Sequence, residues 1–260
     1  MEKVIISLAA ISSRMANLHL TLVSLLEQDF TDFEIRVHVS PDAFLLDEGV
    51  VDIPVECQKL LERTDKIKWL YTRNIGSYRK LLPVLADPLV NNALIVTADD
   101  DTVYPADWLS TLVYYYRRYH CIISYRGHNM RRDANGFVPY RRWMKAKIGK
   151  NPSLFLLPTG KDGVLYHTSF FDRDVLNVHQ AMRLARTADD LWFKWHTAIN
   201  DIPVYMVHTD YSANTLVATD DNGPSLYLMF NEKGGNDKAI HSLESYLDSR
   251  GQARLASLQE

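Results

Sequence analysis

The sequence predicts an α/β fold in which helices flank a mostly parallel central sheet. Short, continuously apolar segments alternate along the first half of the chain with longer segments whose leucines recur at helical spacing. Short apolar runs are typical of strands buried on both faces, and their alternation with amphipathic helices is typical of parallel sheets. A single acidic run at the end of one such strand adds the main functional signal.

The elements of the first half follow in order. The apolar run VIISLAAI predicts a strand over 4–11, and Leu18, Leu22, Leu25 and Leu26 predict a helix within 15–30 because they share one helical face. The alternation of apolar and polar residues predicts a strand over 33–40, and we expect a short helix or turn over 50–63. The remaining expected strands are 67–72, 93–98 and 121–127, and the remaining helices are 77–88, with Pro83 near its first turns, and 105–119.

The second half is less regular. From Gly127 to Pro158 the chain is rich in Arg, Lys, Tyr and Trp without a clear period, and a long irregular stretch in a compact domain is usually functional or mobile. Its cluster at Tyr140, Arg141, Arg142 and Trp143 could stack on sugars, face a lipid-linked acceptor or form a surface lid. Helical patterns return within 185–200 and over 238–251.

Bulk properties narrow the functional class. The 260 residues carry a formal net charge of −3, so no global basic field points to nucleic acid. Cys57 and Cys121 lie far apart without metal-type spacing, which favours reduced thiols. The apolar run at 4–11 is too short for a membrane span, so we expect a cytoplasmic protein whose membrane association, if any, is peripheral. No repeat or linker divides the chain, and we expect one domain over 1–260.

The acidic run Asp99, Asp100 and Asp101 directly follows the predicted strand 93–98. In an extended segment alternate residues point the same way, so Asp99 and Asp101 can present their carboxylates together. Ligands bind at the carboxyl ends of strands in open α/β sheets, and two hard oxygen donors there suit Mg²⁺ or Mn²⁺ completed by substrate phosphates. The alternative is a helix cap, but Pro105 and Asp107 already supply a start signal for the next helix.

Two further segments carry chemistry. Gly76 permits a tight turn, and Arg79 and Lys80 follow where their charges could reach phosphate oxygens, although a solvated basic helix start explains them equally well. Asp189 and Asp190 open a helical pattern, where acidic residues are common for electrostatic reasons alone.

Taken together, these segments resemble GT-A-fold glycosyltransferases of the bacterial polysaccharide type. The resemblance rests on VTADDDTVYPADWL, GSYRKLLP, GKDGVLY and ADDLW, in that order. It implies a GT-A-type fold with a nucleotide-sugar-binding half over 1–126 and an acceptor-binding and catalytic half over 127–260. One departure is that the strand over 33–40 lacks an acidic residue at its end, with Asp42 two places later.

The resemblance also assigns roles. It implies that Asp99 and Asp101 bind the metal with His208 as a candidate third ligand, and that Asp100 faces the ribose or the interior. Lys80, with Gly76 and Arg79, belongs to the donor site. Asp190, supported by Asp189, is the expected general base of an inverting transfer, because a sugar hydroxyl needs a carboxylate to take its proton. The expected partners are a UDP-linked sugar and a saccharide or lipid-linked glycan acceptor, at the inner face of the cell membrane if the acceptor is a lipid.

Two other functions remain open from the sequence. A nucleotidyltransferase shares the α/β front half and metal-binding aspartates, but it normally shows a glycine-rich basic loop after the first strand, and AAISSRMAN contains no glycine. A non-catalytic calcium- or sugar-binding module is the third hypothesis, but calcium loops space their ligands over about twelve residues around a central glycine. The run DDDTVYP does not.

Overall fold

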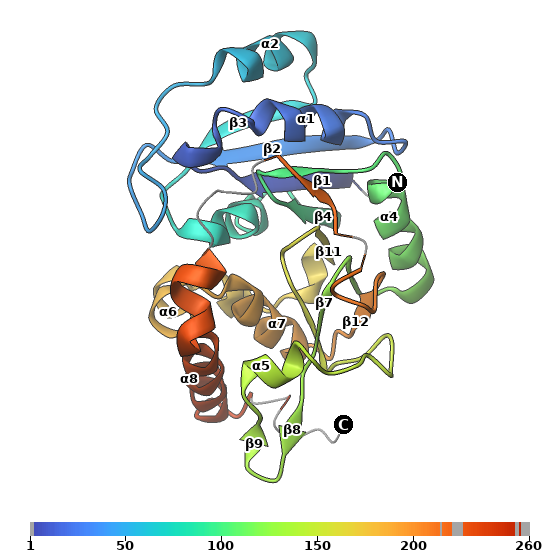
Figure 1. The fold of residues 1–260 in the computed structure, drawn as a ribbon, viewed down its shortest axis with the longest axis vertical. Coiled ribbons are helices and arrows are strands. Elements are labelled where there is room, and N and C mark those ends of the chain that lie inside the picture. Colours follow the sequence, from blue (N-terminus) through green and yellow to red (C-terminus); the bar gives the residue numbers. More distant parts are fainter. Residues whose placement is uncertain (1–2, 214, 220–225, 253–254, 256–260) are drawn as a thin grey trace.

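The computed structural model describes residues 3–213, 215–219, 226–252 and 255 (Figure 1). The strands are β1 (Lys3–Ala9), β2 (Phe33–Val39), β3 (Ile67–Tyr71), β4 (Ala93–Ala98), β5 (Thr102–Val103), β6 (Ile122–Ser124), β7 (Gly127–Asn129), β8 (Arg132–Asp133), β9 (Gly136–Phe137), β10 (Leu156–Pro158), β11 (Val164–His167), β12 (Val204–Met206) and β13 (Val217–Ala218). The helices are α1 (Leu18–Leu26), α2 (Val55–Arg63), α3 (Leu82–Leu85), α4 (Trp108–Tyr119), α5 (Tyr140–Trp143), α6 (Val178–Leu184), α7 (Asp189–Ile199) and α8 (Asn236–Asp248). Short helical turns are η1 (Ser12–Arg14), η2 (Gly76–Lys80), η3 (Thr168–Phe170) and η4 (Arg173–Leu176), and η5 (Tyr227–Gly235) is a helical segment kinked at Lys233 and Gly234.

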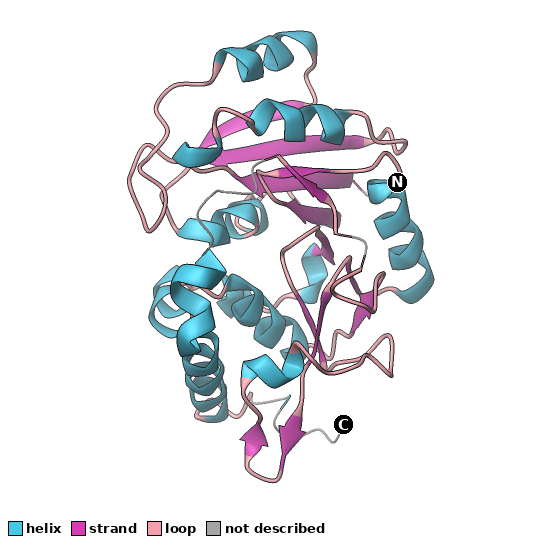
Figure 2. Cartoon of the chain, in the orientation of Figure 1, coloured by secondary structure: helices cyan, strands magenta, loops and turns pink. Residues whose placement is uncertain are grey.

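A seven-stranded sheet forms the centre of the molecule, in the order β12-β6-β11-β4-β1-β2-β3. All neighbours pair in parallel except β11, which is antiparallel to both β4 and β6. Helices flank this sheet: in Figures 1 and 2, α1 and α2 lie above the strands β1–β3, and the η2–α3 segment lies below them. The predicted α/β fold with a mostly parallel sheet is confirmed.

The sheet is held by the apolar side chains that identified its strands. All six residues of β4 are buried, and so are Val4, Ile5, Ile6 and Leu8 of β1. Burying such side chains on both faces stabilises the sheet by roughly 1.5 to 3 kcal/mol for each large residue, before the entropy of ordering the chain is subtracted. The core is therefore built around the central strands of the sheet, β1 and β4 among them.

Three predicted elements differ from the structure. The expected helix over 77–88 is two short pieces, η2 and α3, because Pro83 has no N–H to donate to the carbonyl four residues earlier. The expected strand over 121–127 is divided into β6, in the main sheet, and β7, which pairs with β10 in a separate two-stranded sheet. The irregular stretch 127–158 contains the β8–β9 hairpin and α5 as well.

Cys57 and Cys121 are both buried, and neither forms a disulfide. Among the described residues, no helix combines the length and the apolar composition that crossing a membrane requires.

Candidate active site

The carboxyl ends of β1 and β4 bring two loops together. These strands are neighbours in the sheet, while the chain after β1 continues to β2 on the opposite side, so the sheet reverses its strand order at this point. Such a reversal opens a crevice between the loops that follow the two strands. Here the loops carry Ile11 to Arg14 after β1 and Asp99 to Asp101 after β4.

The three aspartates have different partners. Asp100 Oδ2 accepts a hydrogen bond of 3.0 Å from the backbone N–H of Ile11, so it joins the two loops. The Arg14 guanidinium forms an ion pair with Asp101. Burial raises the pKa of Asp100 to about 7, and the charge of Asp101 acts in the same direction. Arg14 is therefore one of the cations that offset the repulsion within the acidic run.

Asp99 meets the second cation. Its Oδ1 lies 3.1 Å from Lys80 Nζ, and its Oδ2 accepts from the backbone N–H of Asp162 at 3.3 Å. Burial opposes the charge on Lys80, but Asp99, Asp189 and Asp190 together outweigh it and raise the pKa of the ammonium. Lys80 thus stays charged among carboxylates that come from two separate segments of the chain.

The turn before Lys80 depends on Gly76. Its φ of +62° belongs to the left-handed region, and a Cβ there would lie 3.3 Å from the Phe44 ring. Arg79, in the same turn, borders the cleft, but its side chain is fully buried and its Nη2 donates to Asp47 Oδ2 at 2.7 Å. Desolvation lowers the pKa of this guanidinium, and Asp47 opposes that shift.

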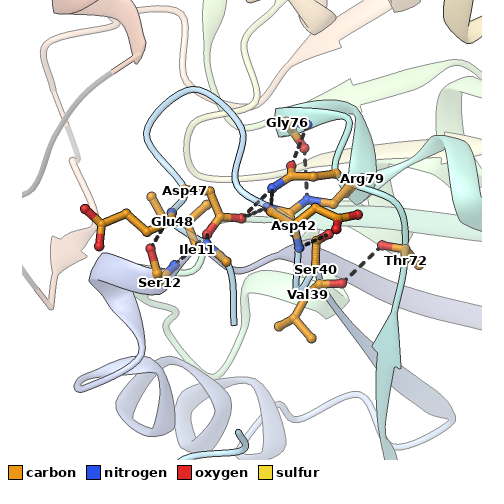
Figure 3. A network of polar contacts seen from close by, with 12 residues as sticks. Ile11, Ser12, Val39, Ser40, Asp42, Asp47, Glu48, Thr72, Gly76 and Arg79 are labelled. Atoms are coloured by element: carbon orange, nitrogen blue, oxygen red, sulfur yellow. Dashed lines mark hydrogen bonds and ion pairs between the residues drawn. The ribbon is translucent and has the colours of Figure 1, made fainter. Parts of the chain in front are cut away.

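Asp47 ties together three loops, as Figure 3 shows. Besides Arg79 of η2, it accepts from the backbone N–H of Ser12 at 3.0 Å and from that of Gly49 at 3.1 Å. The 40–50 loop is therefore fixed against the loop that follows β1. Asp42, which was noted in the sequence shortly after the second predicted strand, has an exposed side chain. Its backbone carbonyl accepts a hydrogen bond from the Asn74 side chain.

The second acidic pair stands at the first turn of α7. Ser77 Oγ donates to Asp189 Oδ1 at 2.7 Å, which joins α7 to η2. The Asp190 carboxylate accepts from the backbone N–H of Gly160. Burial raises the pKa of Asp190 to about 8, and the neighbouring charge of Asp189 adds to the shift. This carboxyl is therefore a much stronger base than an exposed aspartate.

Gly160 is the point at which Lys80 and Asp190 come close. A Cβ built on this glycine would lie 3.0 Å from Lys80 Nζ and 3.2 Å from Asp190 Oδ1. The ends of both side chains thus press against one backbone position, and Lys80 lies between Asp99 and Asp190. The 160–163 loop is itself held from below, because Trp108 Nε1 donates to Asp162 O at 2.7 Å.

Both acidic groups, Arg14, Lys80 and Gly160 line one cleft of about 670 Å³. Eight of the nine residues that the sequence singled out border it: Gly76, Arg79, Lys80, Asp99, Asp100, Asp101, Asp189 and Asp190. His208 is not among the lining residues. Its backbone N–H donates to Tyr125 O, and its half-buried ring packs edge-on against the Tyr125 ring at 5.3 Å.

The carboxylate oxygens of the acidic run are ligands of the kind that a hard divalent cation prefers. Asp99 and Asp101 offer carboxylate oxygens at the rim of the cleft, and Mg²⁺ is commonly held by one or two carboxylates together with substrate phosphates. Among the described residues no group of three or more His, Cys, Asp or Glu side chains is placed to hold a metal. Two carboxylates alone would leave most of the coordination sphere of such an ion to substrate phosphates and water.

Several site residues escaped the sequence analysis. Arg14 could have been found from the sequence, because it follows the strand predicted over 4–11. In the common α/β strand order, that strand is the neighbour of the strand over 93–98 that ends at the aspartates. Ser77 and Asp47 carried none, since only the folded chain places them beside Asp189 and Arg79.

Comparisons with solved structures place the fold. The structure of Staphylococcus aureus TarS 1–349 in complex with UDP-GlcNAc is 15% identical over 100% of this chain and 68% of that chain, with a TM-score of 0.56. The longer TarS structure is 15% identical over 80% of this chain and 36% of its own, with a TM-score of 0.50. The chain thus spans about a third of that protein. The predicted GT-A-type fold is confirmed by these likenesses.

The structure of an enzyme named for a different activity is also similar to this chain. The 4-diphosphocytidyl-2C-methyl-D-erythritol synthase of Anaerococcus prevotii is 17% identical over 95% of this chain and 96% of that chain, with a TM-score of 0.50. No protein-family model matches the sequence, and no curated protein matches it. The fold is therefore shared by proteins of different activity, and the side chains of the cleft must separate the candidates.

Proposed function

We propose that this protein is a metal-dependent glycosyltransferase that moves a sugar from a nucleoside-diphosphate sugar, with UDP as the nucleotide, to a saccharide or lipid-linked glycan acceptor. The observation that carries the proposal is the meeting of two acidic groups in one cleft with Lys80 between them. The similarity to TarS, whose structure contains UDP-GlcNAc, supports this choice of donor.

Each group has a role in the proposed reaction. Asp99 and Asp101 would hold Mn²⁺ or Mg²⁺, which when bound supplies positive charge to a leaving diphosphate. The Lys80 ammonium adds a fixed cation on the same side. His208 is left out of the proposed ligand set, because its ring packs on Tyr125 and it is not among the residues that line the cleft.

Asp190 would accept the proton of the acceptor hydroxyl. Its raised pKa means that the ionised carboxylate takes up a proton more readily than an exposed aspartate does, and Gly160 holds this carboxylate through a backbone hydrogen bond. Asp189, bonded by Ser77, would position the first turn of α7. A base on the side of the sugar opposite the diphosphate gives inversion of configuration.

Ligand-dependent thermal stability tests the donor and metal together. UDP at about one hundred times its dissociation constant contributes roughly 2.7 kcal/mol, which for a chain of this size raises the melting temperature by about 5 to 10 °C. We expect this shift with Mn²⁺ present and a far smaller one without it. Asp101→Ala should abolish the shift, whereas Asp100→Asn should reduce it less, because Asp100 bonds the Ile11 backbone.

The same assay separates the second candidate. The similarity to a diphosphocytidyl synthase keeps a nucleotidyltransferase in view, and such an enzyme would be stabilised by CTP in preference to UDP. Asp190→Asn should keep the UDP–Mn²⁺ shift yet lower sugar transfer at least about 100-fold, which product NMR with a panel of sugar nucleotides would measure. A CTP-specific shift, or an Asp190→Asn variant with full transfer activity, would contradict the proposal.

A further inference from the structure

The segment from Arg131 to Lys150 forms a strongly basic surface. It contains seven Lys and Arg residues and one acidic residue, so it carries a charge of +6, and the rest of the chain carries −9. Six of the seven side chains are exposed, and we refer to them as the basic surface: Arg131, Arg141, Arg142, Lys145, Lys147 and Lys150. Three of them, Arg131, Arg142 and Lys147, also line a surface hollow.

The basic surface rests on packed structure. Trp143 is fully buried and contacts the Phe137 ring at 5.3 Å, which fixes α5 against the β8–β9 hairpin. The backbone N–H of Tyr140 donates to Asp237 Oδ1 of α8 at 2.7 Å, so the start of α5 is also tied to that helix. In Figure 1 these elements lie at the end of the molecule opposite β1–β3. The cations are thus presented on a fixed face.

Exposed apolar side chains adjoin this face. Leu228 and Met229 of η5 are 58% and 56% exposed, and Phe230 and Met144 are 38% and 37% exposed. η5 meets the residue that follows α5, because the Tyr227 hydroxyl Oη lies 3.3 Å from Met144 Sδ. Another side of η5 faces the loop between α6 and α7, where Asn231 exchanges hydrogen bonds with Thr187, and the Leu228–Phe230 triplet remains exposed.

We propose that the basic surface and the Leu228–Phe230 triplet together bind an anionic lipid bilayer. Stable peripheral attachment requires two signals, electrostatic attraction to anionic headgroups and insertion of apolar side chains, and this face offers both. A soluble polyanion would use the cations but would leave the apolar triplet without a role.

The proposed membrane face adjoins the cleft of the proposed glycosyltransferase. What the membrane binding would be for rests on that proposed function. Tyr140, Met144 and Tyr227 line the cleft as well as adjoining the proposed membrane face. Asp190 lines this same cleft. A bilayer on this face would therefore present a lipid-linked acceptor near Asp190.

Vesicle sedimentation tests the proposal without any catalytic readout, so its failure and that of the glycosyltransferase proposal can be told apart. The full chain is mixed with vesicles of phosphatidylglycerol and phosphatidylcholine in roughly equal parts, or of phosphatidylcholine alone. We expect binding to the anionic vesicles only, weakened by high salt. Because each cation near an anionic surface contributes about 1 kcal/mol, Arg141→Gln/Arg142→Gln should lower the partition coefficient about 30-fold.

Two further variants complete the design. Arg117→Gln/Arg118→Gln removes an equally exposed arginine pair from α4 and should leave vesicle binding within about twofold of the unaltered chain. Leu228→Gln/Met229→Gln should lower binding several-fold at a salt concentration that weakens the electrostatic attraction. Circular dichroism melts check that each variant is folded.

Three results would overturn the proposal. One is the absence of binding to anionic vesicles. Another is an equal loss in the two arginine-pair variants, which would indicate attraction without a defined face. The third is that the protein binds inorganic polyphosphate tightly but does not bind vesicles. This result would assign the basic surface to a soluble polyanion.

Discussion

At the scale of single residues, Gly160 sets the distance between the proposed base and the donor-side cation. Its backbone N–H holds Asp190, and its missing side chain leaves room for Lys80 Nζ. Its φ lies outside the left-handed region, so an alanine meets no backbone strain and acts only through the two side chains that it displaces.

Gly160→Ala is therefore expected to lower activity with little effect on folding. A displacement of a few tenths of an ångström at Lys80 and Asp190 should reduce the kcat/KM for sugar transfer at least about tenfold. The free energy of unfolding should change by less than about 1 kcal/mol. Gly149→Ala is the matched control, because a Cβ there meets nothing within 4 Å. Equal activity of the two variants would show that Gly160 does not set this spacing.

At the scale of elements, the buried ion pair between Arg79 and Asp47 joins η2 to the 40–50 loop and, through Ser12, to the end of β1. Both side chains are almost completely buried, at 0% and 2% exposure. Removing one partner of such a pair leaves an uncompensated charge in the interior, which costs more than the pair itself contributes.

Arg79→Met should accordingly lower the free energy of unfolding by about 3 to 5 kcal/mol, measured by urea denaturation. Lys59→Met breaks the Lys59–Glu56 pair on α2, whose side chains are 52% and 54% exposed, and should change stability by less than about 1 kcal/mol. If both variants lose the same stability, the Arg79–Asp47 pair does not hold η2 against the 40–50 loop.

At the scale of the whole molecule, stability depends on pH through Lys194. This side chain is fully buried in α7, and among the described residues its Nζ has no hydrogen-bond partner. Burial lowers its pKa to about 7, whereas an unfolded lysine has a pKa of about 10.4. Between these values the unfolded state binds more protons, so this residue makes stability rise with pH across that window.

Lys194→Met should stabilise the protein by a few kcal/mol at pH 7 and below, where the unaltered chain buries a charge. The advantage should shrink as the pH rises toward about 10, because the native lysine is then neutral in the folded state and loses its charge in the unfolded state as well. Urea denaturation across this range measures it, with exposed Lys238→Met as the control. A pH-independent difference between Lys194→Met and the unaltered chain would mean that Lys194 keeps its charge in the fold.

The sequence by itself determined the strands and the acidic signals. Periodicity and apolar runs are local properties, so β2, β3 and β4 lie within their predicted ranges, and β1 begins one residue before its own. The acidic run was found because it directly follows a buried strand. The break at Pro83 could also have been predicted, since its cause lies within four residues.

Only the tertiary structure decided which of these signals share a site. Ile11 meets Asp100 across 89 positions, and Ser77 meets Asp189 across 112, and no periodicity reports such contacts. The sequence showed neither that Arg79 is withdrawn to Asp47 nor that Lys80 lies between the two acidic groups. These arrangements depend on strand order and loop closure, which bring distant segments together once the whole sheet has formed.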